Sequence, residues 1–381
     1  MPSATTIRIC DPFGNFLVET AEFLDAGNNP GLRYALNCGA VGAMTVTLPP
    51  SYNPLLLKDG RIHIMRSVNG GPAAREGGSC FLIRRWDYAP DHTTITAVHA
   101  NDLIRRRAIL YAPVLGNSLL AGQADNEIKR LWNENSGGAI GTFRAYSTVT
   151  ATADPTQADL SAWVSIQGDM SIAPAVTGYV AWRNMLEVFQ EVADFSAQNG
   201  TWLTAEIVSL SEAQLQIQTF TRQRGADQRF STGSGLLFSP TRGNLENALL
   251  TINAIEEITV GQALGAAIVS NRYTGYAADY ARMAESPFGR IEAIVDSGDA
   301  PNDATLTDDS STIVRAGRPT IHAIADLVET DQCIRGVHYN FGDYLTVEVQ
   351  GIQYDMRLNI MDVALTASGE RTTARFEYNN A

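Results

Sequence analysis

The chain has 381 residues, of which 45% are hydrophobic and 18% are charged, and its formal net charge is −13. This length exceeds one ordinary domain, so we expect two to four domains with normal globular cores. The negative charge argues against a nucleic-acid reader, which needs a basic face to neutralise phosphates. An acidic protein can still line a channel for DNA, because like charge keeps a passing duplex from binding.

The cysteines and histidines give no indication of a metal site. The four cysteines form no CxxC pair and, with the five scattered histidines, no zinc-ligand spacing. Cys10, Cys38 and Cys80 stand in strand-like surroundings and are predicted to be small buried residues. The N-terminus lacks the pattern of a secretion signal, and no apolar stretch reaches the length of a membrane span. We therefore expect free thiols, no metal, no cofactor and no membrane insertion, in a soluble protein made in a reducing cytoplasm.

Residues 1–112 are predicted to form an antiparallel β-barrel-like domain. Short alternating strands separated by glycine and proline turns follow one another along this block. The block ends in Asn101–Arg107, an N-capped helical turn with three consecutive arginines. An isolated basic run in an acidic chain more often forms ion pairs at a subunit or domain boundary than it binds nucleic acid. Arg105, Arg106 and Arg107 are therefore predicted to be interface cations.

A helical connector over residues 113–150 and an α/β insert over residues 151–228 are predicted next. Residues 118–134 have helical spacing and precede a Ser-Gly-Gly sequence that would end a helix. A second helix is predicted over residues 182–198, where an apolar face recurs at helical spacing before Asn-Gly. Two alternating strands complete this module.

Residues 229–381 are predicted to form a second β-barrel-like domain, because strand alternation returns after a polar segment. Within this domain an acidic loop is expected over residues 299–309 and a helical turn over residues 310–316. The whole chain is thus predicted to be α+β and β-dominated. Two antiparallel β-barrel-like domains are expected on either side of the helical and α/β insert.

The acidic pairs of the sequence do not indicate an enzyme. Neighbouring carboxylates in solvated loops rarely converge in a cleft with separated pKa values. The chain also has no GxSxG nucleophile elbow and no glycine-rich phosphate loop. We therefore predict no catalytic, cofactor-binding or metal-binding residues.

Taken in order, these features resemble the tail-hub, or baseplate-hub, family of long-tailed bacteriophages. That pattern has an N-terminal β domain ending in an arginine-rich helical turn, here Asn101–Arg107, and then a helical and α/β middle. In the second β domain, a strand with Arg290 and Glu292 ends in Asp296 and precedes a short helix. The turn Tyr339-Asn340-Phe341-Gly342-Asp343 then begins the closing strands. The resemblance covers nearly the whole chain, although Gly-Arg-Ile-Glu stands here where Arg-Arg-Glu is common.

The resemblance implies a structural virion protein and not an enzyme. Such hubs are homotrimers, in which two tail-tube-like domains per subunit form a pseudo-sixfold ring that matches the hexameric tail tube. The implied partners are the tail tube protein, the distal tail protein and a tail fibre, spike or tape measure protein. DNA would pass through the lumen of this phage tail without specific binding. On this hypothesis Arg290, Glu292, Asp296, Asp299 and Asp343 join the three arginines as predicted interface residues.

Two other functions are compatible with the sequence. The first is another tail ring component, a distal tail or tube protein, which would be hexameric. The second is a β-rich carbohydrate-binding or carbohydrate-processing protein, which an aromatic-lined groove with two converging carboxylates would favour. The five tryptophans fall mostly within amphipathic segments, so core packing is the expected role for them.

Overall fold

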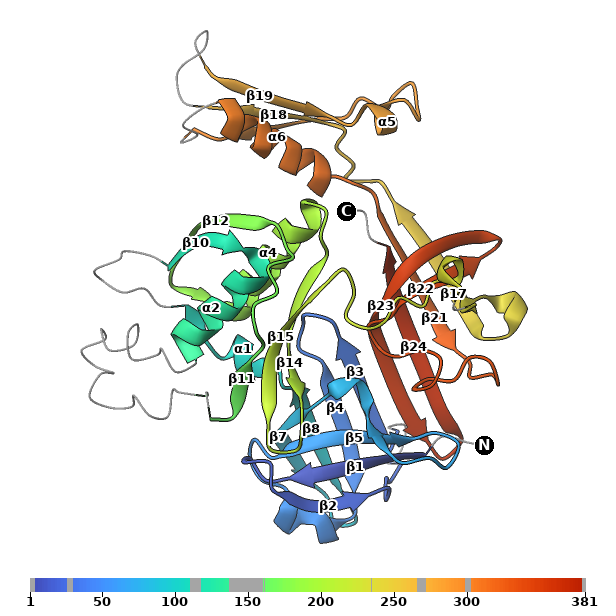
Figure 1. The fold of residues 1–381 in the computed structure, drawn as a ribbon. Helices are drawn as coiled ribbons and strands as arrows, with labels where there is room; N and C mark the ends of the chain where they lie inside the picture. Colours follow the sequence, from blue (N-terminus) through green and yellow to red (C-terminus); the bar gives the residue numbers. More distant parts are fainter. Residues whose placement is uncertain are drawn as a thin grey trace, which may run out of the picture.

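The computed structural model describes residues 4–25, 30–109, 118–136, 160, 162–233, 235–265, 272–298 and 303–378. Strands dominate these residues and helices form a smaller part, so the predicted β-dominated α+β class is confirmed. Figure 1 shows three parts: a large twisted sheet, a mixed insert beside it and a small module that projects from one end. We call these parts the body, the insert and the distal module.

The body is one large sheet to which both β-rich blocks contribute. The first block supplies β1 (Ala4–Cys10), β2 (Phe16–Thr20), β3 (Leu32–Asn37), β4 (Ala43–Leu48), β5 (Arg61–Ser67), β6 (Ala74–Arg75), β7 (Phe81–Tyr88) and β8 (Thr93–His99). The second block supplies β16 (Leu237–Phe238), β17 (Leu245–Asn253), β21 (Thr320–Leu327), β22 (Tyr344–Val349), β23 (Ile352–Thr366) and β24 (Gly369–Tyr378). The main strand order is β17-β21-β24-β23-β3-β4-β8-β7-β5-β1-β2, with β22 also paired to β23.

The two blocks are joined where β23 pairs with β3. The pairing is antiparallel and runs from Ile360 opposite Asn37 to Leu365 opposite Leu32. Along one edge of β23, the first half of the strand therefore pairs with β22 and the second half pairs with β3. Backbone hydrogen bonds thus continue without a break from the first block into the second.

One hydrophobic core lies under both blocks. Tyr34 and Phe81 from the first block belong to the same buried cluster as Phe238 and Phe376 from the second. Burial of apolar surface contributes about 25 cal/mol per Å², so a shared core stabilises the blocks together. The sequence predicted two barrel-like domains, but the described strands of the body belong to one open sheet, and no closed barrel is found among them.

The insert lies beside the body and supplies most of a second hydrophobic core, to which Cys80 and Leu82 of the first block also belong. Its elements are β9 (Ala108–Ile109), β10 (Ser118–Gln123), α2 (Ala124–Ser136), β11 (Val164–Ile166), β12 (Ala175–Val180), β13 (Arg183–Asn184), α4 (Met185–Gln198), β14 (Leu203–Ser209) and β15 (Leu215–Thr221). Helices α2 and α4 pack together and bury Trp132 and Phe189. The predicted helix and the two strands after it are confirmed as α4, β14 and β15.

The helix predicted over residues 118–134 is wrong in its first third. Ser118–Gln123 form strand β10, and helix α2 begins only at Ala124. All six residues of β10 pair with β12, which lies more than fifty residues further along the chain. Pairing with a distant strand overrides the local helical spacing, because strand formation depends on tertiary neighbours more than on intrinsic preference.

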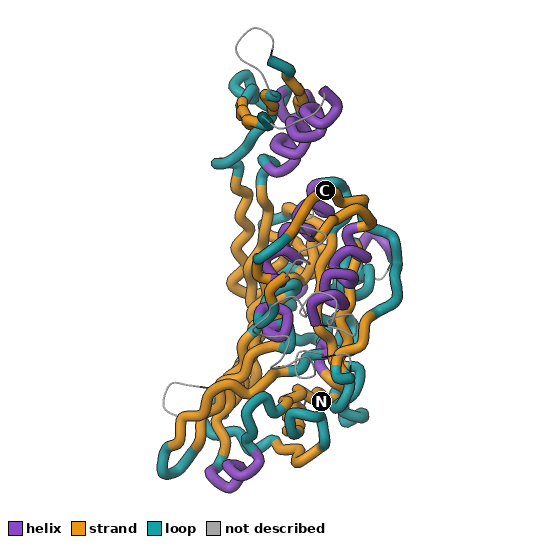
Figure 2. The backbone as a smooth tube through the Cα atoms, turned by 90° about the vertical axis from the view of Figure 1, so that its left-hand side faces the viewer, coloured by secondary structure: helices purple, strands orange, loops and turns teal. Residues whose placement is uncertain are grey.

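The distal module is carried on two strands of the body. Strands β17 and β21 pair along their length and lead into β18 (Val260–Leu264), β19 (Thr274–Ala278), α5 (Tyr280–Met283), β20 (Glu292–Asp296) and α6 (Asp303–Ala316). Both views show the module standing clear of the large sheet (Figures 1 and 2). Strand β18 is central, antiparallel to β19 and parallel to β20, and α6 covers one face of this small sheet.

Helix α6 is twice as long as the helical turn that the sequence predicts. It begins at Asp303, so most of the expected acidic loop forms its first turns. The hydroxyls of Ser310, Ser311 and Thr312 donate to carbonyl oxygens four residues earlier, which satisfies these polar groups inside a helix. Acidic residues near a helix N-terminus are also favoured by the helix dipole.

Candidate assembly interfaces

The three consecutive arginines lie at the boundary between the first β block and the insert. Helix α1 (Asp102–Arg105) holds a buried Asp102, whose carboxylate accepts hydrogen bonds from Arg105 Nε at 2.8 Å and Arg106 Nε at 2.6 Å. Arg106 also donates to Asp59 Oδ1 at 2.9 Å. The carbonyl oxygen of Arg107 accepts from the backbone N–H of Met185, at the start of α4. This run therefore forms ion pairs at a boundary inside the chain.

One face of the small distal sheet is left exposed. Side chains that stand opposite each other on neighbouring strands point to the same face. Gln262 pairs with Tyr276 on one side and with Ile294 on the other, so these three share a face. Gly261 is the neighbour of Gln262 in β18, so a side chain at this position would point to the opposite face. A Cβ there would lie 2.4 Å from the carbonyl oxygen of Ser310 in α6. Ile294 is 66% exposed, so α6 is on the opposite side.

The predicted residues Arg290, Glu292 and Asp296 lie in or directly before β20 of this sheet. Glu292 and Asp296 alternate with Ala293 and Val295, so they share the exposed face with Ile294. Arg290 donates to Glu292 Oε1 at 2.6 Å. Asp296 forms an ion pair with Arg272. Asp299 lies outside the described residues.

Several large apolar side chains are exposed on the distal module and on the two strands that carry it. They are Leu249, Ile252, Ile255, Tyr273, Tyr276, Tyr280, Phe288, Ile291, Ile294 and Ile324. Of these, Tyr276 and Ile294 share the exposed face of the small sheet, and apolar groups that share one surface indicate an interaction site more often than scattered ones do. The sequence pattern indicated the charged residues of this region but not its apolar ones, although Tyr276 and Ile294 lie on the same face as Glu292 and Asp296.

Asp343 has an internal position, which differs from the interface role that the sequence predicts. Only 1% of it is exposed. Its carboxylate accepts the backbone N–H groups of Ala226 and Asn340, each at 2.7 Å. Burial raises the pKa of this carboxyl above its usual value, and these hydrogen bonds oppose that rise. Asp343 therefore closes the turn before β22 and holds the segment that leaves the insert.

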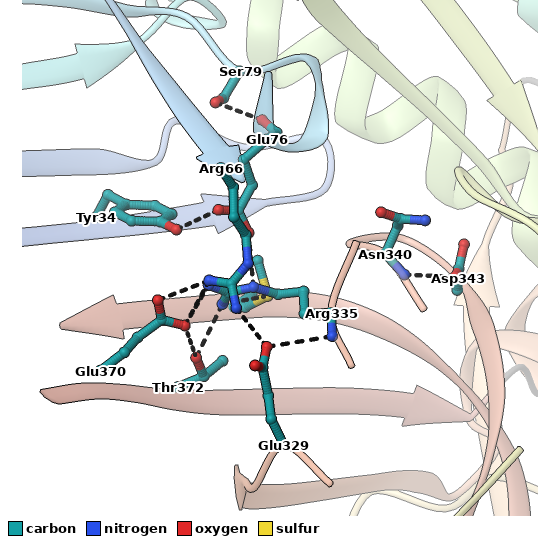
Figure 3. Close-up of polar contacts among 11 residues, drawn as sticks. Tyr34, Arg66, Glu76, Ser79, Glu329, Arg335, Asn340, Asp343, Glu370 and Thr372 are labelled. Carbon is teal, nitrogen blue, oxygen red and sulfur yellow. Dashed lines mark hydrogen bonds and ion pairs between the residues drawn. The ribbon is translucent and has the colours of Figure 1, made fainter. Parts of the chain in front are cut away.

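A buried charge cluster connects the two β blocks (Figure 3). It consists of Tyr34, Arg66, Glu76, Glu329, Arg335, Glu370 and Thr372. Tyr34 and Arg66 lie on β3 and β5 and Glu76 in a 3₁₀ turn (Glu76–Gly78), whereas Glu370 and Thr372 lie on β24. Figure 3 shows that the two arginine side chains approach each other and share Glu370.

Arg335 is the centre of this cluster and is only 2% exposed. Its guanidinium pairs with Glu76 at 3.0 Å and with Glu370 at 2.5 Å, and it donates to Thr372 Oγ1 at 2.9 Å. Burial alone would lower the pKa of Arg335, but Glu76, Tyr34 and Glu370 raise it above its usual value. Buried charges need such pairing, because removing one partner leaves an uncompensated charge in a low-dielectric interior.

The described residues give no sign of a metal site or of a helical membrane span. No group of three or more histidine, cysteine, aspartate or glutamate side chains is placed to hold a metal ion in the part of the chain that the structure describes. No described helix has both the length and the apolar character needed to cross a membrane. Cys10, Cys80 and Cys333 are buried free thiols, and burial raises the pKa of Cys10 to about 11 and that of Cys80 to about 12.

No protein-family model matches the chain, and no curated protein shows significant sequence similarity to it. Solved structures are similar to it over its whole length. The 43 kDa tail protein of prophage MuSo2 from Shewanella oneidensis matches with a TM-score of 0.59 and 10% identity, covering 100% of this chain and 99% of that one. A tail protein from Neisseria meningitidis MC58 matches with a TM-score of 0.53 and 11% identity, covering 100% and 97%.

A third similar structure is a chain of the Francisella PdpA–VgrG complex. Its TM-score is 0.51 at 10% identity, and the match covers 100% of this chain and 58% of that chain. The chain therefore has the fold of prophage tail proteins. The resemblance to phage tail and baseplate proteins that the sequence predicts is confirmed at the level of the fold.

Proposed function

We propose that this chain is a structural tail protein of a phage particle, and more specifically the homotrimeric hub that connects the tail tube to the tail tip or spike. The observation that carries the proposal is the match of its complete fold to prophage tail proteins of nearly the same length. A match over one domain would be compatible with many functions, whereas this one includes body, insert and distal module together.

The architecture of the body supports a ring in which each subunit contributes twice. Each chain has two β-rich blocks, 1–112 and 229–381, so three chains would present six β-rich surfaces to a six-subunit tube. The residues between the blocks, 113–150 and 151–228, would form the connector and the insert beside the ring. The two ends of the open sheet, β2 and β17, are edge strands, and in an assembled ring neighbouring chains would cover them.

The distal module would supply contacts between subunits. Its exposed sheet face combines apolar side chains with the charged residues Arg290, Glu292 and Asp296, a composition suited to a specific interface. The net charge of −13 supports a lumen through which DNA passes without binding. The proposed partners are the tail tube protein, the distal tail protein and a fibre, spike or tape measure protein.

Light scattering and negative-stain microscopy of the purified protein test this proposal. The expected result is a ring with three times the 41.2 kDa mass of the chain and a pseudo-sixfold face. A hexamer would assign the chain to another tail ring, the distal tail or tube class. A protein that stays monomeric, even when mixed with the tail tube protein of the same phage, would contradict the hub.

A further inference from the structure

A small pocket opens between the first β block, helix α1 and the insert. Its volume is about 300 Å³, which is at the lower end of the range of ligand pockets. Leu82, Leu103 and Leu215 form apolar parts of its lining. Because these three side chains come from three different parts of the fold, the pocket forms only when the body and the insert of one chain are folded against each other.

Two exposed aromatic side chains form part of this pocket. Phe13 and Trp163 contact each other with ring centroids 5.3 Å apart, and they are 56% and 39% exposed. Phe13 is held in this position by its turn, since Asp11 accepts the backbone N–H groups of Phe13 and Asn15 at 2.9 and 2.8 Å. A rigid, exposed pair of aromatic rings is the kind of anchor that protein interfaces use most.

The charge of the pocket is opposite to that of the chain as a whole. Its lining includes Arg61, Arg106 and Arg107, against one carboxylate, Asp59. Arg61 is buried and donates to the carbonyl oxygens of Pro12, Glu212 and Ala213, which hold its guanidinium in place without neutralising it. Arg106 is already paired with Asp59 and Asp102, whereas no ion pair of the described residues joins Arg61 to a carboxylate. The lining therefore keeps a positive charge, which favours an anionic ligand on a protein with a net charge of −13.

We propose that this pocket docks a partner protein through an acidic segment that carries one aromatic side chain. The pocket is large enough for one such side chain, with the aromatic pair beside it and the arginines near the carboxylates that flank it. A single-stranded nucleic acid fits less well, because it needs a groove that follows several phosphates. This docking site does not depend on the proposed hub function, because the pocket lies within one chain and needs no ring.

The test uses the full-length protein and a fluorescein-labelled peptide, Asp-Glu-Trp-Glu-Asp, followed by fluorescence anisotropy. We expect saturable binding that weakens as salt rises, because ionic screening reduces the attraction between charges. A peptide with alanine in place of tryptophan, and one with lysines in place of the acidic residues, should bind about tenfold more weakly or not at all. Equal binding of all three peptides would overturn the proposal.

Substitutions inside and outside the lining test whether the peptide binds in this pocket. Trp163→Ala and Arg107→Gln should each weaken binding about tenfold, whereas Trp163→Phe should retain most of it. Tyr88→Ala, which removes an exposed aromatic ring outside the pocket, should change nothing. Thermal unfolding of each variant checks that the fold is intact. No binding of the acidic aromatic peptide, or tighter binding of an oligothymidylate, would also overturn the proposal, the second in favour of a nucleic acid.

Discussion

Arg66 in the first β block and Glu370 in the second form a buried ion pair, with 2.7 Å between Nη1 and Oε2. The two residues are 304 positions apart in the chain. The same carboxylate also binds Arg335, so one glutamate holds two arginines between the blocks. Both blocks must therefore be in place before any of these charges is fully paired.

Removing the central arginine should destabilise the protein strongly. Arg335→Leu leaves Glu76 buried without its guanidinium partner, and we expect a loss of about 3–5 kcal/mol in the free energy of unfolding. Urea denaturation followed by circular dichroism measures this loss. Arg290→Gln, which breaks an exposed pair, is the control and should leave the unfolding midpoint almost unchanged. Similar midpoints for the two variants would contradict a stabilising role for the cluster.

Stability should fall in mildly acidic solution because of two buried histidines. Burial, with Arg75 nearby, lowers the pKa of His63 to about 4, and burial lowers that of His99 to about 4. The unfolded chain binds these protons at about pH 6.5 and the folded chain only near pH 4. The contribution of these two histidines to stability is therefore fully present above pH 6.5, and it is lost as the pH falls from 6.5 towards 4.

The pH effect can be measured where carboxylates contribute little. As the pH falls from 7.5 to 5.5, each histidine should lower the free energy of unfolding by about 1 kcal/mol. His63→Gln should remove about half of this pH dependence, whatever its effect on stability at pH 7.5. A pH dependence that is unchanged in both His63→Gln and His99→Gln would exclude the buried histidines as its cause.

A methyl group at the helix–sheet contact of the distal module should loosen that module. A Cβ on Gly275 would lie 2.1 Å from the carbonyl oxygen of Leu306, so Gly275→Ala forces α6 away from β19. We expect faster hydrogen exchange in β18, β19 and α6, and no change in the body. Gly168→Ala is the matched control, because a Cβ there meets nothing within 4 Å. Uniform exchange rates throughout the Gly275→Ala variant would contradict this packing.

A charge on the exposed face of the distal sheet should affect assembly and leave folding intact. Ile294→Asp changes a side chain that is already in contact with solvent, so the melting temperature should stay the same. If this face joins subunits, the oligomer should dissociate at concentrations where the unmodified protein remains assembled. Ile352→Asp, at an exposed position on the β22–β23 hairpin, is the control. Intact oligomers in both variants would place the interface elsewhere.

The sequence predicted the elements that local patterns determine. Helix α4 has a regular apolar face and a capping residue, Asn184, whose side chain accepts the backbone N–H of Leu186 at 3.0 Å. The strands that follow have clear alternation, so they too were predicted close to their observed bounds. The β-dominated α+β class, and the order of the two β-rich blocks and the insert along the chain, could be predicted from such segments.

What the sequence could not predict depends on distant partners. Strand β10 looks helical by itself, and only its pairing with β12 shows that it is extended. Arg66 was visible as part of an alternating strand, but nothing near it in the sequence points to Glu370. The same limit applies to Asp343, whose carboxylate binds the backbone of Ala226, 117 positions away.

The two strands that carry the distal module run side by side from the body to the module, with Leu245 opposite Leu327 at one end and Asn253 opposite Thr320 at the other. The hydrogen bonds between antiparallel strands lie perpendicular to the strands. A pull on the module would therefore be transmitted along two covalent backbones at once, and would not peel the hydrogen bonds apart in sequence. Strand β21 of this ribbon also pairs with β24 from His322 to Leu327, and Arg315 of α6 donates to the side chain of Asn199 at the end of α4. The module is thus tethered firmly under tension, which suits a part that projects from the body and would be loaded by its neighbours.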